Sequence, residues 1–514
     1  MTTTPVMIGT GALSIDDVVA VAREGAPVQL SEEARAAIAE TRAHIDHLAE
    51  QPTPVYGVST GFGALARRHI PAEKRAQLQC SLVRSHAAGS GPEVETEVIR
   101  ALMLLRLSTL ATGRTGVRVE VADTYAQFLN AGITPVVHEY GSLGCSGDLA
   151  PLSHCALALM GEGVVRDREG NVLDAGQALS QAGITPVELK EKEGLALING
   201  TDGMLGQLCL AIRDFQNLAR CADLATAMSV QGLRGTTGVF EPHLQALRPH
   251  PGQAAAAANI LALCEDSPIV SAAFEEFAKT HVQDAYSVRC APQVAGGFRD
   301  TLEHAIAVAN RELASAVDNP VVTLEGEVRS NGNFHGAPVA YVLDFLAIVA
   351  ADLASISERR TDRFLDPARN RGLHPFLAND PGVDSGHMIA QYTQAAIVSE
   401  MKRLAAPASV DSIPSSAMQE DHVSMGWSAA RKLRKSVDGL ARVLAVEILT
   451  AARGIDMREQ EPSEPVKGVI EALRKEVPGV GPDRFLAPEI EGTRRLVVDG
   501  SLLAAAESTG VTLT

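Results

Sequence analysis

The sequence is poor in aromatic side chains, and this limits the folds that it can form. Phe, Tyr and Trp make up 4% of its 514 residues, with a single tryptophan, whereas hydrophobic residues as a whole make up 46%. The core must therefore be built largely from Leu, Val, Ile and Ala, which favours packed helices because the aromatic strand formers are scarce. A chain of this length exceeds one compact core, so two or three lobes are expected.

Paired cysteines, basic charge and long apolar runs are also missing. The seven cysteines are odd in number and form no CxxC pair, so neither a disulfide framework nor a zinc site is expected, and a reducing compartment fits. The net charge of −17 argues against a nucleic-acid partner. We see no signal peptide and no uncharged apolar run of about 18 residues. The expected location is the cytoplasm, without a membrane partner.

Helical patterns dominate the rest of the chain. Ser31 caps a predicted helix that runs to residue 50. Further helices are predicted at residues 95–112, 251–266, 337–362 and 429–455, and strand-and-turn regions are predicted at 163–175 and 316–334. We therefore expect a mainly α fold with a mixed α/β region at residues 1–200, a bundle of long helices at 201–455 and a helical tail at 456–514.

One glycine-rich segment, GSLGCSGDLAPLSH at residues 141–154, surrounds a single serine, Ser146. A hydrolase nucleophile elbow needs G-x-S-x-G, but Asp148 stands at the last glycine. A phosphate loop needs a lysine after its glycines, and none follows. A dinucleotide loop at GFGALA, from Gly61, lacks a preceding strand. These three alternatives are therefore disfavoured.

Backbone chemistry explains the segment better. The amide nitrogen of Gly147 has no side chain beside it and can adopt unusual dihedral angles. It can attack the carbonyl carbon of Cys145 with loss of water, and loss of a second water from Ser146 leaves an exocyclic methylidene on a five-membered ring. The product is an electrophile that needs Ser146 and Gly147 but only the backbone of Cys145. Asp148 and Pro151 suit the first turn of a helix whose positive end would face this ring.

The same segment resembles the signature of the aromatic amino acid ammonia-lyases and aminomutases, in which an Ala-Ser-Gly triad forms 4-methylideneimidazol-5-one (MIO). Cys145 replaces the usual alanine, whose side chain does not take part. Further segments resemble the family in the same order: YGVSTGFG from Tyr56, GLALINGTD from Gly194, VQDAYSVRCAPQVAGG, NGNFHG and QEDHVSMG. Asp202 stands where glutamine is common. The resemblance spans roughly residues 50–430 and implies an MIO made from Cys145-Ser146-Gly147, without an external cofactor or a metal.

The resemblance also implies roles for individual residues. Ser146 supplies the methylidene carbon, Tyr56 is the base, and Arg289 grips the substrate carboxylate through its planar fork. Tyr286 bonds the substrate or the MIO carbonyl, and Asn199 and Gln283 bond the MIO group or the amino end of the substrate. Whether Tyr56 or Glu420 removes the β-proton stays open, as does attack by MIO on the amino group or on the ring.

Three residues bear on the choice of substrate. The Ser85-His86 pair and Glu420 in QEDHVSM resemble the histidine-specific members. Glu420 would accept from one imidazole nitrogen and His86 would donate to the other, whereas a phenyl ring would leave both groups unpaired. Phe334 is a third candidate for the substrate pocket.

The family resemblance implies elimination of ammonia from L-histidine to give trans-urocanate, the first step of histidine degradation. Tyrosine or phenylalanine ammonia-lyase activity, or an MIO-dependent aminomutase, is the alternative. An inactive scaffold on the same fold is disfavoured by the intact site residues, and a fumarase-type lyase by the absence of a GSSxMPxKxN-like loop. The implied fold is that of the fumarase/aspartase-like superfamily, with long antiparallel helices in a homotetramer whose active sites are each shared by three chains.

Overall fold

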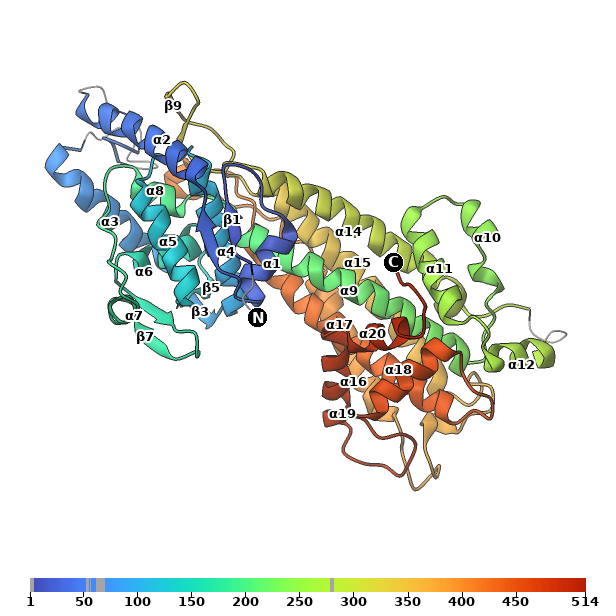
Figure 1. Cartoon of the computed structure of the whole chain (residues 1–514). Helices are drawn as coiled ribbons and strands as arrows, with labels where there is room; N and C mark the ends of the chain where they lie inside the picture. The colour runs from blue at the N-terminus through green and yellow to red at the C-terminus, as the bar shows by residue number, and fades with distance from the viewer. Residues whose placement is uncertain (1–3, 52–54, 56, 62–69, 278–281) are drawn as a thin grey trace. The chain divides into compact units, whose positions relative to one another are not determined.

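The computed structural model describes residues 4–51, 55, 57–61, 70–277 and 282–514, and helices dominate them (Figure 1). The mainly α fold predicted from the sequence is confirmed. The chain forms two compact units. The first comprises Met1–Ala211, Ile306–Asp344 and Pro407–Arg431, and the second comprises Ile212–Ala305, Phe345–Ala406 and Lys432–Thr514. The division into three regions stays a prediction.

The first unit contains short helices and small sheets. Its helices are α1 (Ile15–Arg23), α2 (Glu32–Glu50), α3 (Arg75–His86), α4 (Thr96–Ala111), α5 (Val119–Ala131), α6 (Leu149–Leu159), α7 (Ala175–Ala182) and α8 (Glu193–Ile198), with 3-10 turns η2 (Ala72–Lys74) and η5 (Ser416–Met418). Its strands are β1 (Val6–Ile8), β2 (Val28–Leu30), β3 (Ser90–Glu93), β4 (Thr134–Pro135), β5 (His138–Tyr140), β6 (Val164–Arg166), β7 (Val172–Asp174), β8 (Val321–Val322) and β9 (Val328–Arg329).

These elements follow from local sequence signals. The Ser31 hydroxyl accepts from the Ala34 amide at 3.0 Å and caps α2, as predicted. The predicted hairpin at 163–175 forms as β6 and β7, and the predicted strands after residue 316 form as β8 and β9. Strands β3 and β5 pair antiparallel, and β5 leads directly into the segment that carries Ser146. Helix α4 is buried on nearly all sides and forms the centre of this unit.

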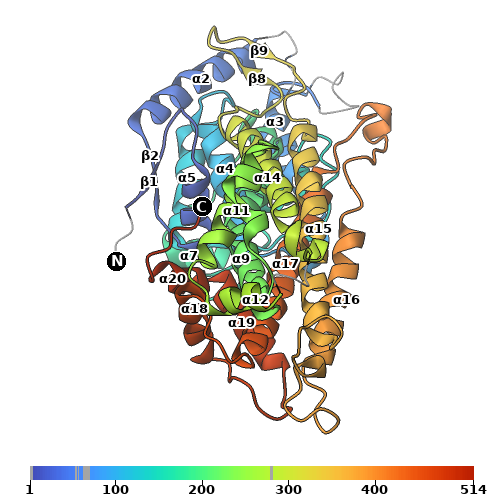
Figure 2. The same ribbon diagram turned by 90° about the vertical axis from the view of Figure 1, so that its right-hand side faces the viewer.

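The second unit is a bundle of long helices, most of which lie side by side in Figures 1 and 2. Its elements, some of which begin or end in the first unit, are α9 (Asp202–Gly232), η3 (Gly238–Phe240), α10 (Pro242–Ala246), α11 (Pro251–Leu263), α12 (Pro268–Phe277), α13 (Tyr286–Arg289), α14 (Ala291–Leu313), α15 (Ala337–Leu365), η4 (Pro375–Leu377), α16 (Met388–Leu404), α17 (Gly426–Asp456), α18 (Glu464–Arg474), α19 (Ala487–Val498) and α20 (Ser501–Glu507).

A buried carboxylate joins three of these helices. Glu447 on α17 accepts from Ser229 on α9 and from Ser357 and Arg360 on α15, at 2.5–2.9 Å. Arg360 also donates to the Ser287 carbonyl of α13 at 3.1 Å. A buried ion pair is tolerated where further hydrogen bonds satisfy both charged groups, as they do here. The network fixes the position of the short helix α13 within the bundle.

Among the described residues, α15 is the one helix long and apolar enough to cross a membrane by length and composition. Asp344 and Asp352 interrupt it, and 61% of its most apolar stretch is buried inside the protein. This burial is typical of the core helix of a bundle.

Candidate active site

The backbone around Ser146 is held by a close approach of two glycines. Gly147 has φ of 77° and pairs with Gly200 in an isolated parallel bridge. The Asp148 amide donates to the Gly200 carbonyl oxygen at 2.7 Å. A Cβ at residue 147 would lie 1.9 Å from that oxygen, which excludes every residue but glycine. Ser146 itself is half-buried between the buried residues Cys145 and Gly147.

Cys145 lies in a small apolar cluster with Val423 and Met425. Burial, together with the charge of the nearby Glu420 carboxylate, raises the pKa of its thiol to about 12. The thiol is therefore neutral at physiological pH, and thiolate chemistry is not available to it. This is consistent with a residue that contributes only its backbone.

Asp148 begins α6, as expected, but its side chain does not cap that helix. Its carboxylate accepts instead from the Ser142 hydroxyl at 2.9 Å and from the Met204 amide in the first turn of α9 at 2.8 Å. Full burial raises the pKa of Asp148 to about 7, against the hydrogen bonds, which lower it. The side chain therefore ties the Ser146 segment to the start of α9.

Asn199 follows α8 and lies next to Gly200, with 1% of its surface exposed. Its amide nitrogen donates to Asp318 Oδ1 at 3.1 Å and to the Asn319 carbonyl at 3.0 Å. Its carbonyl oxygen Oδ1 is buried and has no hydrogen-bond partner among the residues that the structure describes. A buried polar atom without a partner is costly, so this oxygen marks a position for a hydrogen-bond donor.

Sequence reasoning missed three buried charged residues that support Asn199. Arg106, from α4, donates to the backbone carbonyls of Ala196 and Asn199 at 2.9 and 3.1 Å and pairs with Asp202. This ion pair accounts for an acidic residue where the family commonly has glutamine. Lys192 and Asp318 form a second pair that is fully buried. No local pattern could have revealed either pair, because the partners lie far apart in the sequence.

His86 lies at the end of α3 and is half-buried. The Ser85 hydroxyl lies 3.0 Å from the Leu82 carbonyl oxygen and 3.0 Å from His86 Nδ1, and the direction of the second hydrogen bond depends on the tautomer of the ring. Burial lowers the pKa of His86, which favours the neutral ring. The donor role expected for His86 stays a prediction.

Glu420 lies close enough to raise the pKa of both His86 and Cys145 through its charge. Its Oε2 accepts from the Ser415 hydroxyl at 2.9 Å. Phe334 is half-buried, and the residue after it, His335, stacks on His422 with Nε2 and Nδ1 3.1 Å apart. The NGNFHG and QEDHVSMG segments are therefore in contact. Tyr56 lies outside the described residues.

The second unit carries the other three candidates. The Arg289 guanidinium lies 4.4 Å from the centre of the Tyr286 ring, and its Nε donates to the Asp284 carbonyl at 2.9 Å. Among the described residues, its terminal nitrogens have no hydrogen-bond partner. Tyr286 is 69% exposed, and Gln283 is also exposed. This arrangement leaves the fork of Arg289 available for an anion.

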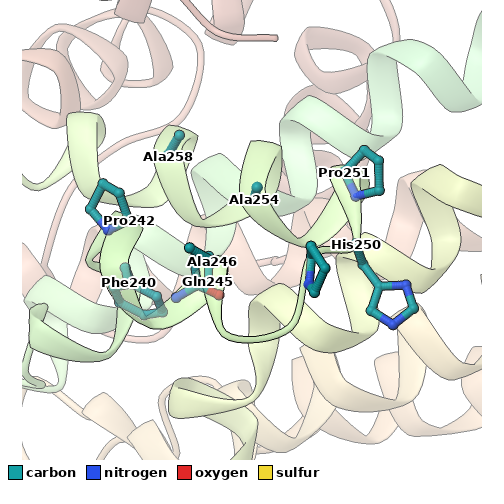
Figure 3. A pocket seen from close by; sticks show the side chains of 9 residues that line it. Phe240, Pro242, Gln245, Ala246, His250, Pro251, Ala254 and Ala258 are labelled. Carbon is teal, nitrogen blue, oxygen red and sulfur yellow. The ribbon is translucent and has the colours of Figure 1, made fainter.

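An apolar cavity of about 430 Å³ lies between α10 and α11 in the second unit (Figure 3). Phe240, Pro242, Pro249 and Pro251 supply much of its wall, and His250 lies at its edge. None of the described site residues lines this cavity, so it is separate from the candidate active site. Among the described residues, no group of three or more His, Cys, Asp or Glu side chains is placed to hold a metal ion.

Comparison with known proteins identifies the family. A family model for aromatic amino acid lyases matches residues 13–475. The chain belongs to the aromatic amino acid lyase family. Within it, a histidine ammonia-lyase of Streptomyces avermitilis is 64% identical over 505 residues, which are 98% of each chain. A histidine ammonia-lyase of Gloeobacter violaceus is 46% identical over 97% of this chain and 96% of its own.

Solved structures of the family share the fold. A tyrosine aminomutase of Streptomyces globisporus has a TM-score of 0.93 and 39% identity, covering 99% of this chain and 100% of its own. A histidine ammonia-lyase of Trypanosoma cruzi has a TM-score of 0.90 and 38% identity, covering 98% of this chain and 95% of its own.

Proposed function

We propose that this protein is a histidine ammonia-lyase, which eliminates ammonia from L-histidine to give trans-urocanate, the first step of histidine degradation. The observation that carries the proposal is 64% identity to a histidine ammonia-lyase across 98% of both chains. The pair of His86 and Glu420 supports this substrate, because a neutral imidazole has one N–H donor and one acceptor nitrogen. Glu420 accepts from the N–H and His86 donates to the other nitrogen, whereas a phenyl ring leaves both side chains without partners.

We further propose that Cys145, Ser146 and Gly147 form the MIO group without an external cofactor. The residues present fit such a group: Gly147 has a left-handed backbone and no room for a Cβ, and Ser146 is held between two buried neighbours. When formed, the group supplies an electrophilic carbon that makes the amino nitrogen a better leaving group. The Asp148 carboxylate accepts from the Met204 amide, and the Gly200 carbonyl accepts from the Asp148 amide. These two hydrogen bonds hold the backbone next to the group.

The remaining residues bind and orient the substrate. Arg289 pairs with the carboxylate, and Tyr286, which its guanidinium contacts, holds the same end of the molecule. Gln283 and Asn199 bond the MIO group or the amino end of the substrate. Tyr56 or Glu420 takes the β-proton, and Phe334 packs against the substrate ring.

We propose that the protein is a cytoplasmic homotetramer whose active sites are each shared by three chains. Exposed apolar side chains on one face of α15 support an interface: Tyr341, Phe345 and Ile348 are 44–45% exposed at helical spacing. No nucleic-acid or membrane partner is proposed. The alternative is a tyrosine or phenylalanine ammonia-lyase or an aminomutase. The 39% identity to a tyrosine aminomutase supports this alternative.

Product analysis with L-histidine, L-tyrosine and L-phenylalanine tests the proposal. We expect urocanate from L-histidine, whereas coumarate, cinnamate or a β-amino acid as the main product would overturn the substrate assignment. Intact mass should lie two waters below the encoded chain. Ser146→Ala should restore one water or both and abolish urocanate formation. The matched control is Ser153→Ala, which removes a buried hydroxyl that bonds only the Leu149 carbonyl of its own helix and should leave both results unchanged.

A further inference from the structure

The side-chain amide of Asn199 can have only one orientation. The two groups within hydrogen-bonding distance of its nitrogen are the Asp318 carboxylate and the Asn319 backbone carbonyl, and both are acceptors only. The amide must therefore present its NH₂ to them. Its Oδ1 then faces the other way and is buried, with no partner in the described part of the chain. At residue 199 the site offers an acceptor rather than a donor.

A buried ion pair enforces this orientation. Asp318 is fully buried and accepts from three donors: Oδ2 accepts from Lys192 Nζ, and Oδ1 accepts from the Asn199 side chain at 3.1 Å and from the Asn319 backbone amide at 2.7 Å. Lys192 is also fully buried and has a left-handed backbone at the start of α8. Because a lysine cation can only donate, it keeps Asp318 as an acceptor on both sides. The order of hydrogen bonds from Lys192 through Asp318 to Asn199 therefore cannot reverse.

The chemistry of the site limits what Asn199 Oδ1 can bind. Ring closure consumes the amide protons of Ser146 and Gly147, so the finished MIO ring offers acceptors and no N–H. An acceptor on Asn199 cannot pair with it. The α-amino group of the substrate, in contrast, carries N–H donors. Gly200, the next residue, contacts Gly147, which places Asn199 beside the segment where this amino group must react.

We propose that Asn199 Oδ1 accepts a hydrogen bond from the α-amino group of the substrate, and that Lys192 and Asp318 are positioning residues that fix this acceptor. The proposal rests on the proposed function, because it needs an α-amino acid in the site. It chooses the amino end over the MIO group as the partner of Asn199. It also gives a role to a buried ion pair that the reaction itself does not use.

Asp318→Asn is a direct test because it keeps shape and removes charge. The Lys192 cation needs the one carbonyl of the new asparagine, so the NH₂ of that asparagine will face the Asn199 side chain and the Asn319 amide. Asn199 then loses its carboxylate acceptor and keeps only the Asn319 carbonyl, so the acceptor that it presents to the substrate is no longer held in place. Lys192→Met combined with Asp318→Asn serves as a second variant, because it leaves no unpaired buried cation that would prevent folding.

The readout compares two ligands that differ only in the amino group. L-Histidine carries it, and imidazole-4-propionate lacks it and is measured as an inhibitor. In Asp318→Asn and in Asn199→Ala we expect the KM for L-histidine to rise roughly 10- to 100-fold, the loss of one hydrogen bond to a charged group. The inhibition constant of imidazole-4-propionate should stay within about twofold of wild type. This ligand has no α-amino group, so it makes no hydrogen bond to Asn199 Oδ1 that the variants could remove.

Asp223→Asn is the matched control. Asp223 is a fully buried aspartate in the second unit that pairs with Arg299 and accepts from the Asn259 amide, so the same substitution removes an equivalent ion pair away from the site. It should change neither the KM for L-histidine nor the inhibition constant of imidazole-4-propionate. Intact mass two waters below the encoded chain must be found in every variant, which shows that the MIO group has formed.

The positioning role would be overturned if Asp318→Asn raised the KM for L-histidine and the inhibition constant of imidazole-4-propionate equally, or if it raised neither. In the double variant no cation competes for the carbonyl at residue 318, which can again accept from Asn199, so L-histidine should bind more tightly than in Asp318→Asn; if it does not, the role is likewise wrong. A wild-type protein that makes no urocanate would instead contradict the proposed function. The two failures are therefore distinguishable.

Discussion

The Gly200 carbonyl oxygen occupies the place where a side chain at residue 147 would begin. It accepts from the Asp148 amide at 2.7 Å and would lie 1.9 Å from a Cβ on Gly147. This contact joins the segment that contains Gly147 to the segment that contains Gly200, and the proposed chemistry depends on both. Glycine at 147 is thus required twice, once by the cyclisation and once by packing.

Gly147→Ala should therefore prevent formation of the MIO group. The methyl group cannot fit against the Gly200 carbonyl, and alanine is strained at a φ of 77°. We expect an intact mass equal to the encoded chain and no urocanate. Gly170→Ala is a useful control, since it also has a positive φ but has open space around it. A Gly147→Ala protein that still loses two waters would contradict the steric argument.

Asp148 should make folding less favourable as the pH rises toward neutrality. Its pKa is about 7 in the folded protein and near 3.8 when unperturbed. Between these values the folded state binds a proton that the unfolded state does not, so the contribution to stability falls as pH rises from about 4 to about 7. Three pKa units correspond to roughly 4 kcal/mol at most.

Asp148→Asn removes this titration. Relative to wild type, its free energy of unfolding should improve by a few kcal/mol between pH 5 and pH 8, measured by urea unfolding. Asp167→Asn is the control: Asp167 is half-buried at the surface, its pKa is lowered by the hydrogen bond from Asn171, and it titrates below this window in both states. A constant difference between Asp148→Asn and wild type across the window would show that Asp148 does not titrate there.

The start of the helix at Asp148 was predictable from the sequence, whereas the destination of its side chain was not. Asp followed by Pro151 indicates a first helical turn, and α6 begins there. The carboxylate instead bonds the amide of Met204, on a helix that only tertiary folding brings near. Local patterns fix where elements begin and end, but a long-range contact depends on the packing of the whole unit.

The same limit applies to the site as a whole. Ser146, Gly147 and Asn199 were identified because motifs carry them, and the structure brings them together through Gly200. Lys192 and Asp318 lie 126 residues apart and belong to no motif, so only the fold reveals them. The donor role of His86 stays a prediction, since the direction of its hydrogen bond with Ser85 depends on the tautomer of the ring.

His86→Leu should change the choice of substrate. Removal of the His86 ring leaves one nitrogen of the substrate imidazole without a partner and opens an apolar position for a phenyl ring. We expect kcat/KM for L-histidine to fall roughly 100-fold and that for L-phenylalanine to rise, measured from urocanate and cinnamate. His243→Leu changes an exposed histidine in the second unit and should alter neither value. Unchanged selectivity in His86→Leu would assign recognition of the ring to Glu420 alone.

Arg289→Met should weaken binding of the substrate carboxylate while keeping the length of the side chain. The Asp284 carbonyl accepts from Arg289 Nε, and the guanidinium lies over the Tyr286 ring. The terminal nitrogens of Arg289 have no hydrogen-bond partner among the described residues. A bidentate carboxylate pair would satisfy them, so we expect KM for L-histidine to rise roughly 100-fold.

L-Histidinamide, which lacks the carboxylate, separates this role from a structural one. As an inhibitor it should bind wild type and Arg289→Met alike, since it makes no ion pair with the fork. Arg403→Met, at an exposed arginine on α16, controls for the loss of one positive charge. If Arg289→Met weakens the binding of L-histidinamide as much as that of L-histidine, Arg289 acts by holding Tyr286 and α13 in place rather than by binding the carboxylate.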